Sequence, residues 1–179
     1  MKFVNSRITG GSLRGREIIS PELEKTHPMG SRERLAILNS IGPDIADSTI
    51  LDLFAGTGAL GIEALSRGAK RATFIEKNHK VTEILRKNIK NLGLEDNAEI
   101  IEKDVINFDS DDAFDYVFID PPYDAIESFD IEKIMQKFSG ANKIILSHPK
   151  GTEFELEGFD ARTKTYAGAA VTIFTNKRD

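Results

Sequence analysis

Apolar runs and helical amphipathic patterns alternate along most of this chain. Short apolar runs predict buried strands at residues 49–54, 71–76, 98–101, 115–119 and 143–146. Apolar residues at helical spacing predict helices at residues 59–67, 79–92 and 127–138. Gly68 and Gly93 follow the first two of these helices, where a glycine commonly ends a helix. This alternation predicts a parallel sheet covered by helices on both faces.

The two ends of the chain have a different pattern. Residues 7–19 predict a small hairpin, in which Gly10-Gly11 would supply the positive φ angles of a tight turn. Residues 20–31 are loop-like, and a helix is expected to begin with Ser31 as its N-cap and to end at Gly42-Pro43. Its apolar side would comprise Leu35, Leu38 and Ile41. Residues 161–174 predict a second hairpin, which would add antiparallel strands to the sheet.

Composition narrows the class of protein. A length of 179 residues fits one domain, and no apolar run approaches the ~18 residues that a membrane span needs. The first residues lack a secretory signal, so we expect a cytoplasmic protein with no membrane contact. The absence of cysteine excludes disulfides, thiolate metal sites and a cysteine nucleophile. His27, His79 and His148 are scattered, so we expect no metal.

Charge is distributed unevenly. The net charge is −5, which disfavours a general nucleic-acid binder. However, the first sixteen residues contain Lys2, Arg7, Arg14 and Arg16 and no acidic residue. A basic arm on an acidic body fits a nucleic-acid partner, and a solvated hairpin would have the same composition.

A glycine-rich turn connects the first predicted strand to its helix. Gly56, Gly58 and Gly61 form the pattern G-x-G-x-x-G, in which the missing Cβ atoms let the backbone approach a ligand. Glu76 ends the second strand, where it could accept hydrogen bonds from a ribose diol. The same features fit a nicotinamide dinucleotide, S-adenosylmethionine, or a tight turn without a ligand.

Two further acids favour S-adenosylmethionine. Asp52 precedes the turn and could reach the amino-acid end of that cofactor, and Asp104 follows the third strand and could accept from the adenine amino group. The full set of predicted cofactor-binding residues is Asp52, Phe54, Ala55, Gly56, Thr57, Gly58, Gly61, Glu76, Lys77, Asn78, Asp104 and Val105.

Asp120-Pro121-Pro122-Tyr123, directly after the fourth strand, is the most specific motif. Two prolines fix φ and remove two backbone donors, so that a carboxylate and a carbonyl together offer acceptors only. This is the complement of an exocyclic –NH₂ group, whose two N–H groups would bind Asp120 and the Pro121 carbonyl. The nitrogen lone pair would then face the methyl donor, with Tyr123 stacked on the base. A plain Pro-Pro turn is the alternative.

These segments resemble known families. Residues 52–65, D-x-F-x-G-x-G-x-L-G-x-E-A-L, resemble the cofactor loop of class I, Rossmann-like S-adenosylmethionine-dependent methyltransferases, and residues 120–123 match the (Asp/Asn/Ser)-Pro-Pro-(Tyr/Phe) signature of amino-methyltransferases. Residues 7–16 are similar to the opening of the 16S rRNA guanine-N2 methyltransferases of the RsmD type. Residues 26–35 are similar to their Arg-Pro-Thr-x-Asp-(Arg/Lys)-Val-Arg-Glu segment, from which His27, Met29 and Ser31 depart.

The resemblance implies an α/β, mostly parallel doubly wound sheet with a C-terminal antiparallel hairpin. Residues 1–30 would be a basic RNA-contacting extension with an N-terminal β-hairpin, and residues 31–179 the methyltransferase domain. The implied reaction methylates N2 of a guanine in 16S rRNA, on an assembled or assembling 30S subunit, and releases S-adenosylhomocysteine. We expect a monomer. The predicted RNA contacts are Arg7, Arg14, Arg16, Arg32 and Arg34.

Two rival functions stay open. One is a DNA amino-methyltransferase acting on N6 of adenine or N4 of cytosine, although 179 residues would leave no room for its usual target-recognition domain. The other is a nicotinamide-dependent oxidoreductase, which would explain the glycine turn and Glu76 but has no use for Asp120-Pro121-Pro122-Tyr123.

Overall fold

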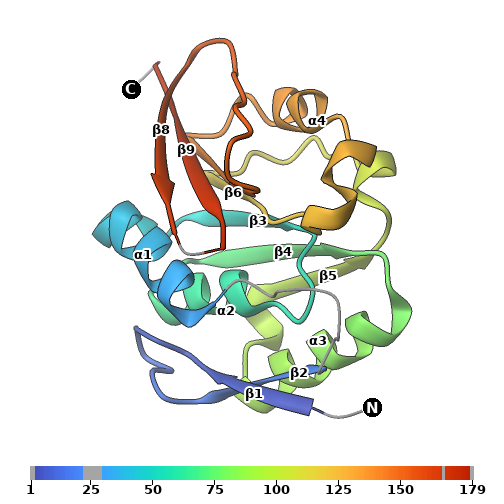
Figure 1. Cartoon of the computed structure of the whole chain (residues 1–179). Helices are drawn as coiled ribbons and strands as arrows, with labels where there is room; N and C mark the ends of the chain where they lie inside the picture. Colours follow the sequence, from blue (N-terminus) through green and yellow to red (C-terminus); the bar gives the residue numbers. More distant parts are fainter. Residues whose placement is uncertain (1–2, 22–29, 167, 178–179) are drawn as a thin grey trace.

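A twisted seven-stranded sheet forms the centre of the computed structural model, which describes residues 3–21, 30–166 and 168–177 (Figure 1). The strand order is β5-β4-β3-β6-β7-β9-β8. Neighbouring strands from β5 to β7 are parallel, and β9 is antiparallel to both β7 and β8. The strands are β3 (Thr49–Leu53), β4 (Arg71–Glu76), β5 (Ala98–Glu102), β6 (Tyr116–Ile119), β7 (Lys143–His148), β8 (Phe159–Thr165) and β9 (Ala170–Asn176). The predicted α/β fold with a C-terminal hairpin is confirmed.

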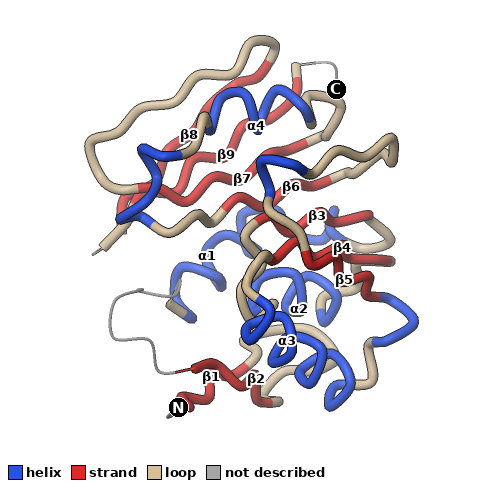
Figure 2. The backbone as a smooth tube through the Cα atoms, turned by 90° about the vertical axis from the view of Figure 1, so that its right-hand side faces the viewer, coloured by secondary structure: helices blue, strands red, loops and turns tan. Residues whose placement is uncertain are grey.

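Helices cover both faces of this sheet (Figures 1 and 2). On one face, α1 (Ser31–Ile41), α2 (Ala59–Ser66) and α3 (His79–Leu92) share a core with inward residues such as Ile50 and Phe118. On the other, α4 (Ile131–Lys137) packs against Leu51 and Val117. Successive strand residues alternate between the two cores. Short 3-10 helices η1 (Gly42–Ile45), η2 (Glu95–Asn97), η3 (Val105–Asn107) and η4 (Tyr123–Ser128) complete the described elements.

Two helix predictions need correction. In α1, Ser31 is the first helical residue, and the N-cap is Gly30, which makes no side-chain cap hydrogen bond. Leu35 is 37% exposed, because the buried face of α1 comprises Arg34, Ile37, Leu38 and Ile41. The helix predicted at 127–138 begins only at Ile131, since the Asp130 side chain caps it by accepting from Lys133 N and residues before it form η4.

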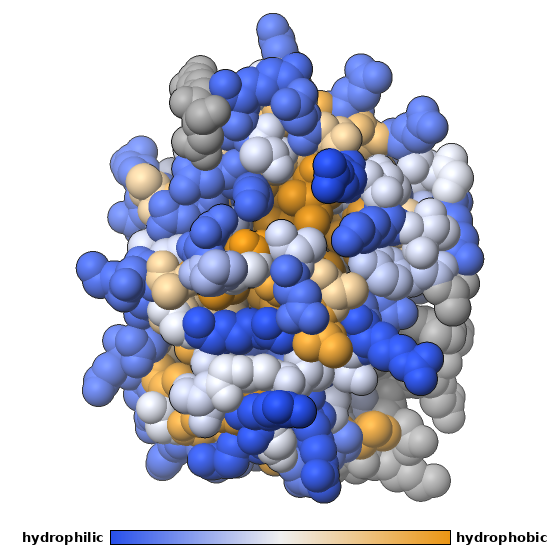
Figure 3. Space-filling view, turned by 90° about the vertical axis from the view of Figure 1, so that its left-hand side faces the viewer, coloured by the Kyte–Doolittle hydropathy of each residue, from blue (hydrophilic) through white to orange (hydrophobic). Residues whose placement is uncertain are grey.

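An apolar area remains visible on the side of the molecule where α1 and β8 lie (Figure 3). Hydrophilic side chains surround it. Among the described residues, no helix is both long enough and apolar enough to cross a membrane.

The N-terminal hairpin is confirmed, but its turn differs from the prediction. Strand β1 (Phe3–Arg7) pairs antiparallel with β2 (Glu17–Pro21), and residues 8–16 connect them as a long loop instead of a tight Gly10-Gly11 turn. Gly11 has φ 77°, and a Cβ there would collide with the Ser66 carbonyl of α2. The glycine is therefore required for docking the loop onto α2.

Candidate cofactor and substrate site

The glycine turn leads from the carboxyl end of β3 into α2. Gly58 is the N-cap of α2 with φ 84°, and a Cβ there would collide with Leu85 of α3. A Cβ on Gly61 would collide with the Phe74 ring. Gly56 differs, because the nearest atom to a Cβ there would be the Phe54 carbonyl oxygen at 4.0 Å. Two glycines thus serve close packing, and the third leaves open space in which a ligand could approach the backbone.

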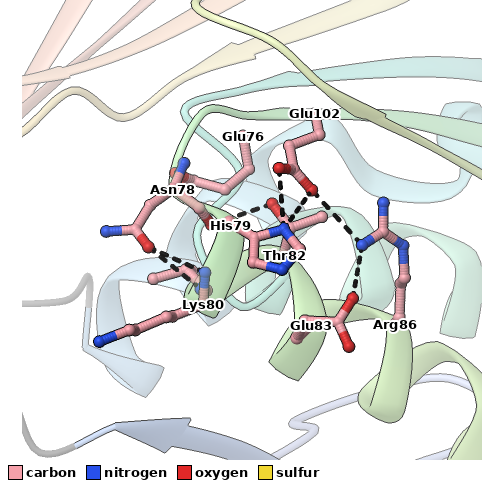
Figure 4. A network of polar contacts seen from close by, with 9 residues as sticks. Glu76, Asn78, His79, Lys80, Thr82, Glu83, Arg86 and Glu102 are labelled. Atoms are coloured by element: carbon pink, nitrogen blue, oxygen red, sulfur yellow. Dashed lines mark hydrogen bonds and ion pairs between the residues drawn. The ribbon is translucent and has the colours of Figure 1, made fainter.

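Glu76 joins the glycine turn to the start of α3. Its Oε2 accepts from Gly56 N at 2.9 Å. Its Oε1 accepts from Asn78 N at 2.8 Å, and both of these residues are labelled in Figure 4. A carboxylate offers about four acceptor positions, so about two remain for other donors. The Asn78 side chain caps α3, accepting from Lys80 N at 3.1 Å. A carboxylate held in this way fits the predicted role of binding a ribose diol.

His79 belongs to an exposed ion network beside this carboxylate. His79 Nδ1 lies 2.9 Å from Glu102, and Arg86 pairs with Glu83 at 2.7 Å and with Glu102 at 3.5 Å (Figure 4). The His79 side chain is 72% exposed, as expected for a solvated helix start.

Lys77, the residue after Glu76, forms an ion pair with Asp104. Asp104 Oδ2 pairs with Lys77 Nζ at 3.2 Å, and Oδ1 accepts from Ile106 N at 3.1 Å. The Ile106 N–H and Lys77 lower the pKa of Asp104, so its carboxyl is ionised. Lys77 Nζ also lies 5.8 Å from the centroid of the Phe129 ring, which packs edge-to-face on Phe54. The structure therefore brings together three of the residues predicted for the cofactor, Lys77, Asp104 and Phe54.

Asp52, Ala55 and Val105 are buried. Asp52 is 2% exposed, and its Oδ2 accepts from Gly61 N at 3.0 Å, which ties the strand to α2. Burial raises the pKa of Asp52 well above its usual value, and the nearby Asp120 and Glu76 carboxylates raise it further. Through its hydrogen bond with Gly61 N, Asp52 supports the end of the glycine turn where α2 begins. Ala55 and Val105 are 8% and 5% exposed, so that mainly their backbones are available to a ligand.

Asp120 lies beside the glycine turn. It directly follows β6, whose Ile119 pairs with Leu53 of β3, so the two strand ends are neighbours. Burial raises the pKa of Asp120 to about 6, although a hydrogen bond from Ser147 and the charge of Arg34 oppose the shift. The carboxyl is thus mostly ionised at neutral pH.

Tyr123 is fixed by a residue that sequence reasoning missed. Its hydroxyl forms a hydrogen bond with Ser147 Oγ, and burial raises the pKa of Tyr123 to about 12, so the phenol stays neutral. Ser147 is 1% exposed near the end of β7, beside Asp120, which follows the neighbouring strand β6. A polar residue directly after the apolar run 143–146 was the available signal. The next residue, His148, is buried against Thr172 at 2.8 Å and is structural, as expected.

The predicted RNA contacts separate into two groups. Arg7, Arg14, Arg16 and Arg32 are exposed, whereas Arg34 is 3% exposed. Its Nε lies 4.0 Å from Glu63 Oε2, and its Nη2 donates to the Arg7 carbonyl at 3.4 Å. Arg34 is therefore enclosed, within reach of the charge of Asp120, and its predicted RNA contact stays a prediction. Lys2, His27 and Met29 lie outside the described residues.

Comparison with known proteins places this geometry in context. A family model described as "Conserved hypothetical protein 95" matches residues 6–172. The ribosomal RNA small subunit methyltransferase D of Escherichia coli (strain K12) is 40% identical over 119 residues, or 65% of this chain and 60% of that protein. The Haemophilus influenzae protein of the same name is 39% identical over 122 residues, 65% and 63%. The chain thus matches less than two thirds of the length of these curated relatives.

Solved structures agree with the fold. The Escherichia coli protein yhhF has a TM-score of 0.85 at 29% identity, with 98% of this chain and 100% of that chain covered. An RNA methyltransferase from Salinibacter ruber, solved in complex with S-adenosyl-L-homocysteine, has a TM-score of 0.66 at 18% identity, covering 86% and 95%. The second similarity shows the fold alone. The family model, the curated relatives and the yhhF structure confirm the resemblance to the RsmD-type methyltransferases.

Proposed function

The chain belongs to the conserved hypothetical protein 95 family, and we propose that it is an S-adenosylmethionine-dependent methyltransferase for the N2 amine of a guanine in 16S rRNA. The observation that carries the proposal is the adjacency of two strand ends. The glycine turn follows β3, and Asp120 follows β6, its parallel neighbour. A donor held by the first and an amine held by the second would meet at the carboxyl edge of the sheet, where such folds bind ligands.

The residues around the glycine turn fit the cofactor. When bound, S-adenosylmethionine supplies an electrophilic methyl group on its sulfonium sulfur. Glu76 has acceptor positions left for the ribose hydroxyls, and the open side of Gly56 admits close approach of the backbone. Asp104 would accept from the adenine amino group. A nicotinamide dinucleotide would fit the same turn, but it leaves the motif at 120–123 without a role.

Asp120 is proposed to orient and stabilise the reacting amine. The ionised carboxylate and the Pro121 carbonyl would each accept one N–H bond of the amine, which favours a pyramidal nitrogen with its lone pair free to attack. Positive charge develops on this nitrogen in the transition state, so both acceptors bind the transition state more strongly than the ground state. The nitrogen then loses one proton through Asp120 to solvent. Tyr123, held by Ser147, would stack on the base.

The extension formed by residues 1–30 is proposed to bind the RNA at a surface that is distant from the glycine turn. Arg14 and Arg16 lie on the loop that docks at the C-terminal ends of α2 and α3, with Arg16 Nη2 2.8 Å from the Asn91 carbonyl. The glycine turn lies at the opposite end of α2, a helix of 8 residues and therefore ~12 Å long. RNA that places a guanine beside Asp120 and also touches these arginines must cover an extended surface, which supports a folded RNA substrate.

Transfer of a labelled methyl group tests the proposed substrate. The protein is incubated with labelled S-adenosylmethionine and a 30S subunit, naked 16S rRNA or duplex DNA, each lacking the modification. We expect N2-methylguanine in 16S rRNA, presented naked or in the particle. Label found only in DNA would overturn the RNA assignment. Calorimetry that detects binding of NAD but not of S-adenosylhomocysteine would overturn the reaction class.

Glu76→Ala should weaken cofactor binding. The substitution removes the proposed acceptor of the ribose hydroxyls. It also removes the hydrogen-bond acceptor of Gly56 N and Asn78 N. Two charge-assisted hydrogen bonds at about 1.5 kcal/mol each correspond to roughly 100-fold in dissociation constant. Calorimetry with S-adenosylhomocysteine measures the change. Glu83→Ala, in the first turns of α3 and paired with Arg86, is the control and should bind normally.

Arg14→Ala combined with Arg16→Ala should weaken RNA binding without affecting cofactor affinity. Each arginine is exposed and distant from the glycine turn, and each would neutralise one phosphate. We expect the slope of log K against log salt to decrease by about two for 16S rRNA. Filter binding at several salt concentrations measures this slope. An unchanged slope contradicts the assignment of this loop to the RNA interface.

A further inference from the structure

We infer that Asn88, a buried residue in the middle of α3, is a positioning residue that couples the N-terminal hairpin to the glycine turn. The inference rests on the proposed function, since it makes RNA docking and cofactor binding interdependent. Asn88 is 1% exposed and contacts both segments. Its Oδ1 accepts from Ile19 N at 2.9 Å, and its Nδ2 donates to the Ile19 carbonyl at 2.9 Å and to the Thr57 carbonyl at 3.0 Å.

These three hydrogen bonds form one bridge. The two bonds to Ile19 engage both backbone groups of one residue of β2, which fixes the position of that strand against α3. The third bond engages the carbonyl of Thr57, which lies between Gly56 and Gly58 in the turn. One amide side chain can thus make at most one more strong hydrogen bond. Movement of β2 relative to α3 would therefore strain or break the bond that holds the turn.

A second contact connects the same two segments. Ser20 Oγ lies 3.0 Å from Thr57 Oγ1. The side chain of Thr57 thus contacts the hairpin directly, while its backbone carbonyl is bound by Asn88. The turn needs such support, because Phe54, Gly56 and Gly58 have φ of 60°, 56° and 84°. This left-handed backbone is sterically unfavourable for a residue such as Phe54 and entropically costly for glycine.

The other end of the hairpin is anchored independently of the turn. Ser66 Oγ donates to the Gly10 carbonyl at 2.6 Å and accepts from Leu13 N at 3.0 Å. Ser66 is 3% exposed and lies at the last residue of α2, the end away from the glycine turn. Ser66 and Asn88 therefore each bind two backbone groups of the hairpin, but only Asn88 also contacts the turn.

This difference gives a matched pair of variants, Asn88→Ala and Ser66→Ala. Both remove a buried hydrogen-bonding side chain, so both should lower the melting temperature by a few degrees. Only Asn88→Ala should weaken S-adenosylhomocysteine binding, by about 5- to 20-fold in calorimetry of the free protein. Asn88→Ser and Ser20→Ala give the same test with smaller expected changes, about 2- to 5-fold, if Asn88→Ala is too unstable to purify.

A second arm of the experiment measures the coupling itself. In the wild type, 16S rRNA or the 30S subunit should change the affinity for S-adenosylhomocysteine, and by linkage the cofactor should change RNA affinity by the same factor. Asn88→Ala should reduce this factor to near one, whereas Ser66→Ala should retain it.

The outcomes separate the inference from the proposed function. If the wild type does not bind S-adenosylhomocysteine, the proposed function fails. If the wild type binds it and the Asn88 and Ser20 variants bind it within twofold of the wild type, the function stands and the coupling role of Asn88 is wrong. Equal weakening by Ser66→Ala would also overturn the inference, because the effect would then reflect general loss of hairpin packing.

Discussion

Asp120→Asn is expected to lower the rate of methyl transfer by about 10²- to 10³-fold while S-adenosylhomocysteine affinity stays within about threefold of the wild type. The amide keeps the shape of the side chain but loses the negative charge, and half of its polar surface becomes a donor facing the N–H groups of the amine. Loss of one preorganised group aimed at developing charge typically costs this much. Single-turnover transfer to 16S rRNA measures the rate, and calorimetry measures the affinity.

The pH dependence provides an internal control. Burial raises the pKa of Asp120 to about 6, so the acceptor form of the carboxyl is lost as the pH falls below that value. The wild-type rate should be nearly constant above about pH 7 and should decrease about tenfold per pH unit well below pH 6. The residual rate of Asp120→Asn should lack this dependence. A variant that retains the wild-type profile would show that another group titrates.

The same variant should be more stable than the wild type at neutral pH. The pKa of Asp120 in the folded protein, about 6, lies above its unfolded value of 3.8. The unfolded chain therefore releases its proton first, and stability decreases as the pH rises from about 4 to about 6. Asn does not ionise, so Asp120→Asn should gain at least ~1 kcal/mol at pH 8 and none at pH 3.5 in urea denaturation. A gain of stability with a loss of activity is typical of a functional site.

The sequence was sufficient to predict those parts of the site that depend on the local pattern of apolar and polar residues. The glycine turn and Asp120 each directly follow an apolar strand, Glu76 is the last residue of one, and parallel strands place their carboxyl ends at one edge. Their proximity therefore followed from the fold class. Helix α3 was predicted with its observed bounds, because its apolar spacing and the terminal Gly93 agree, and the structure adds the Asn78 cap at its start. Element type was reliable wherever local signals and packing favoured the same structure.

The missed features depend on contacts distant in sequence. Arg34 was predicted only as an RNA contact, but in α1 it also pairs with Glu63, which is 29 positions away along the chain. Asn88 was placed on the apolar face of its helix, yet its partners Ile19 and Thr57 lie in other segments. The loop at residues 8–16 replaced the expected tight turn because Gly11 is needed against Ser66. No pattern within one segment predicts which polar side chains are paired in the interior.

Glu63→Leu is expected to destabilise the protein by about 3–5 kcal/mol, the largest loss of stability that we predict. Glu63 is 0% exposed, lies 4.0 Å from the Arg34 guanidinium and accepts from Thr9 N and from Thr9 Oγ1 at 2.9 Å. Leucine fills a similar volume but leaves a buried positive charge without this compensation and Thr9 without its acceptor. Removal of one partner of a buried ion pair typically costs this much. Urea denaturation measures the change, which corresponds to a decrease in Tm of roughly 10 °C.

The double variant Arg34→Met, Glu63→Leu separates the charge from the packing. Replacing both ions by apolar side chains removes the desolvation penalty along with the attraction, so much of the loss should be recovered. Glu99→Gln is the surface control: its partner Arg71 is 58% exposed and Glu99 itself 41%, and an exposed pair contributes at most about 1 kcal/mol. A double variant less stable than Glu63→Leu would mean that Arg34 stabilises the fold through its other contacts. Arg34 would then have to be regarded as a structural support of the region around Asp120, whose pKa its charge lowers, and not merely as the counter-ion of Glu63.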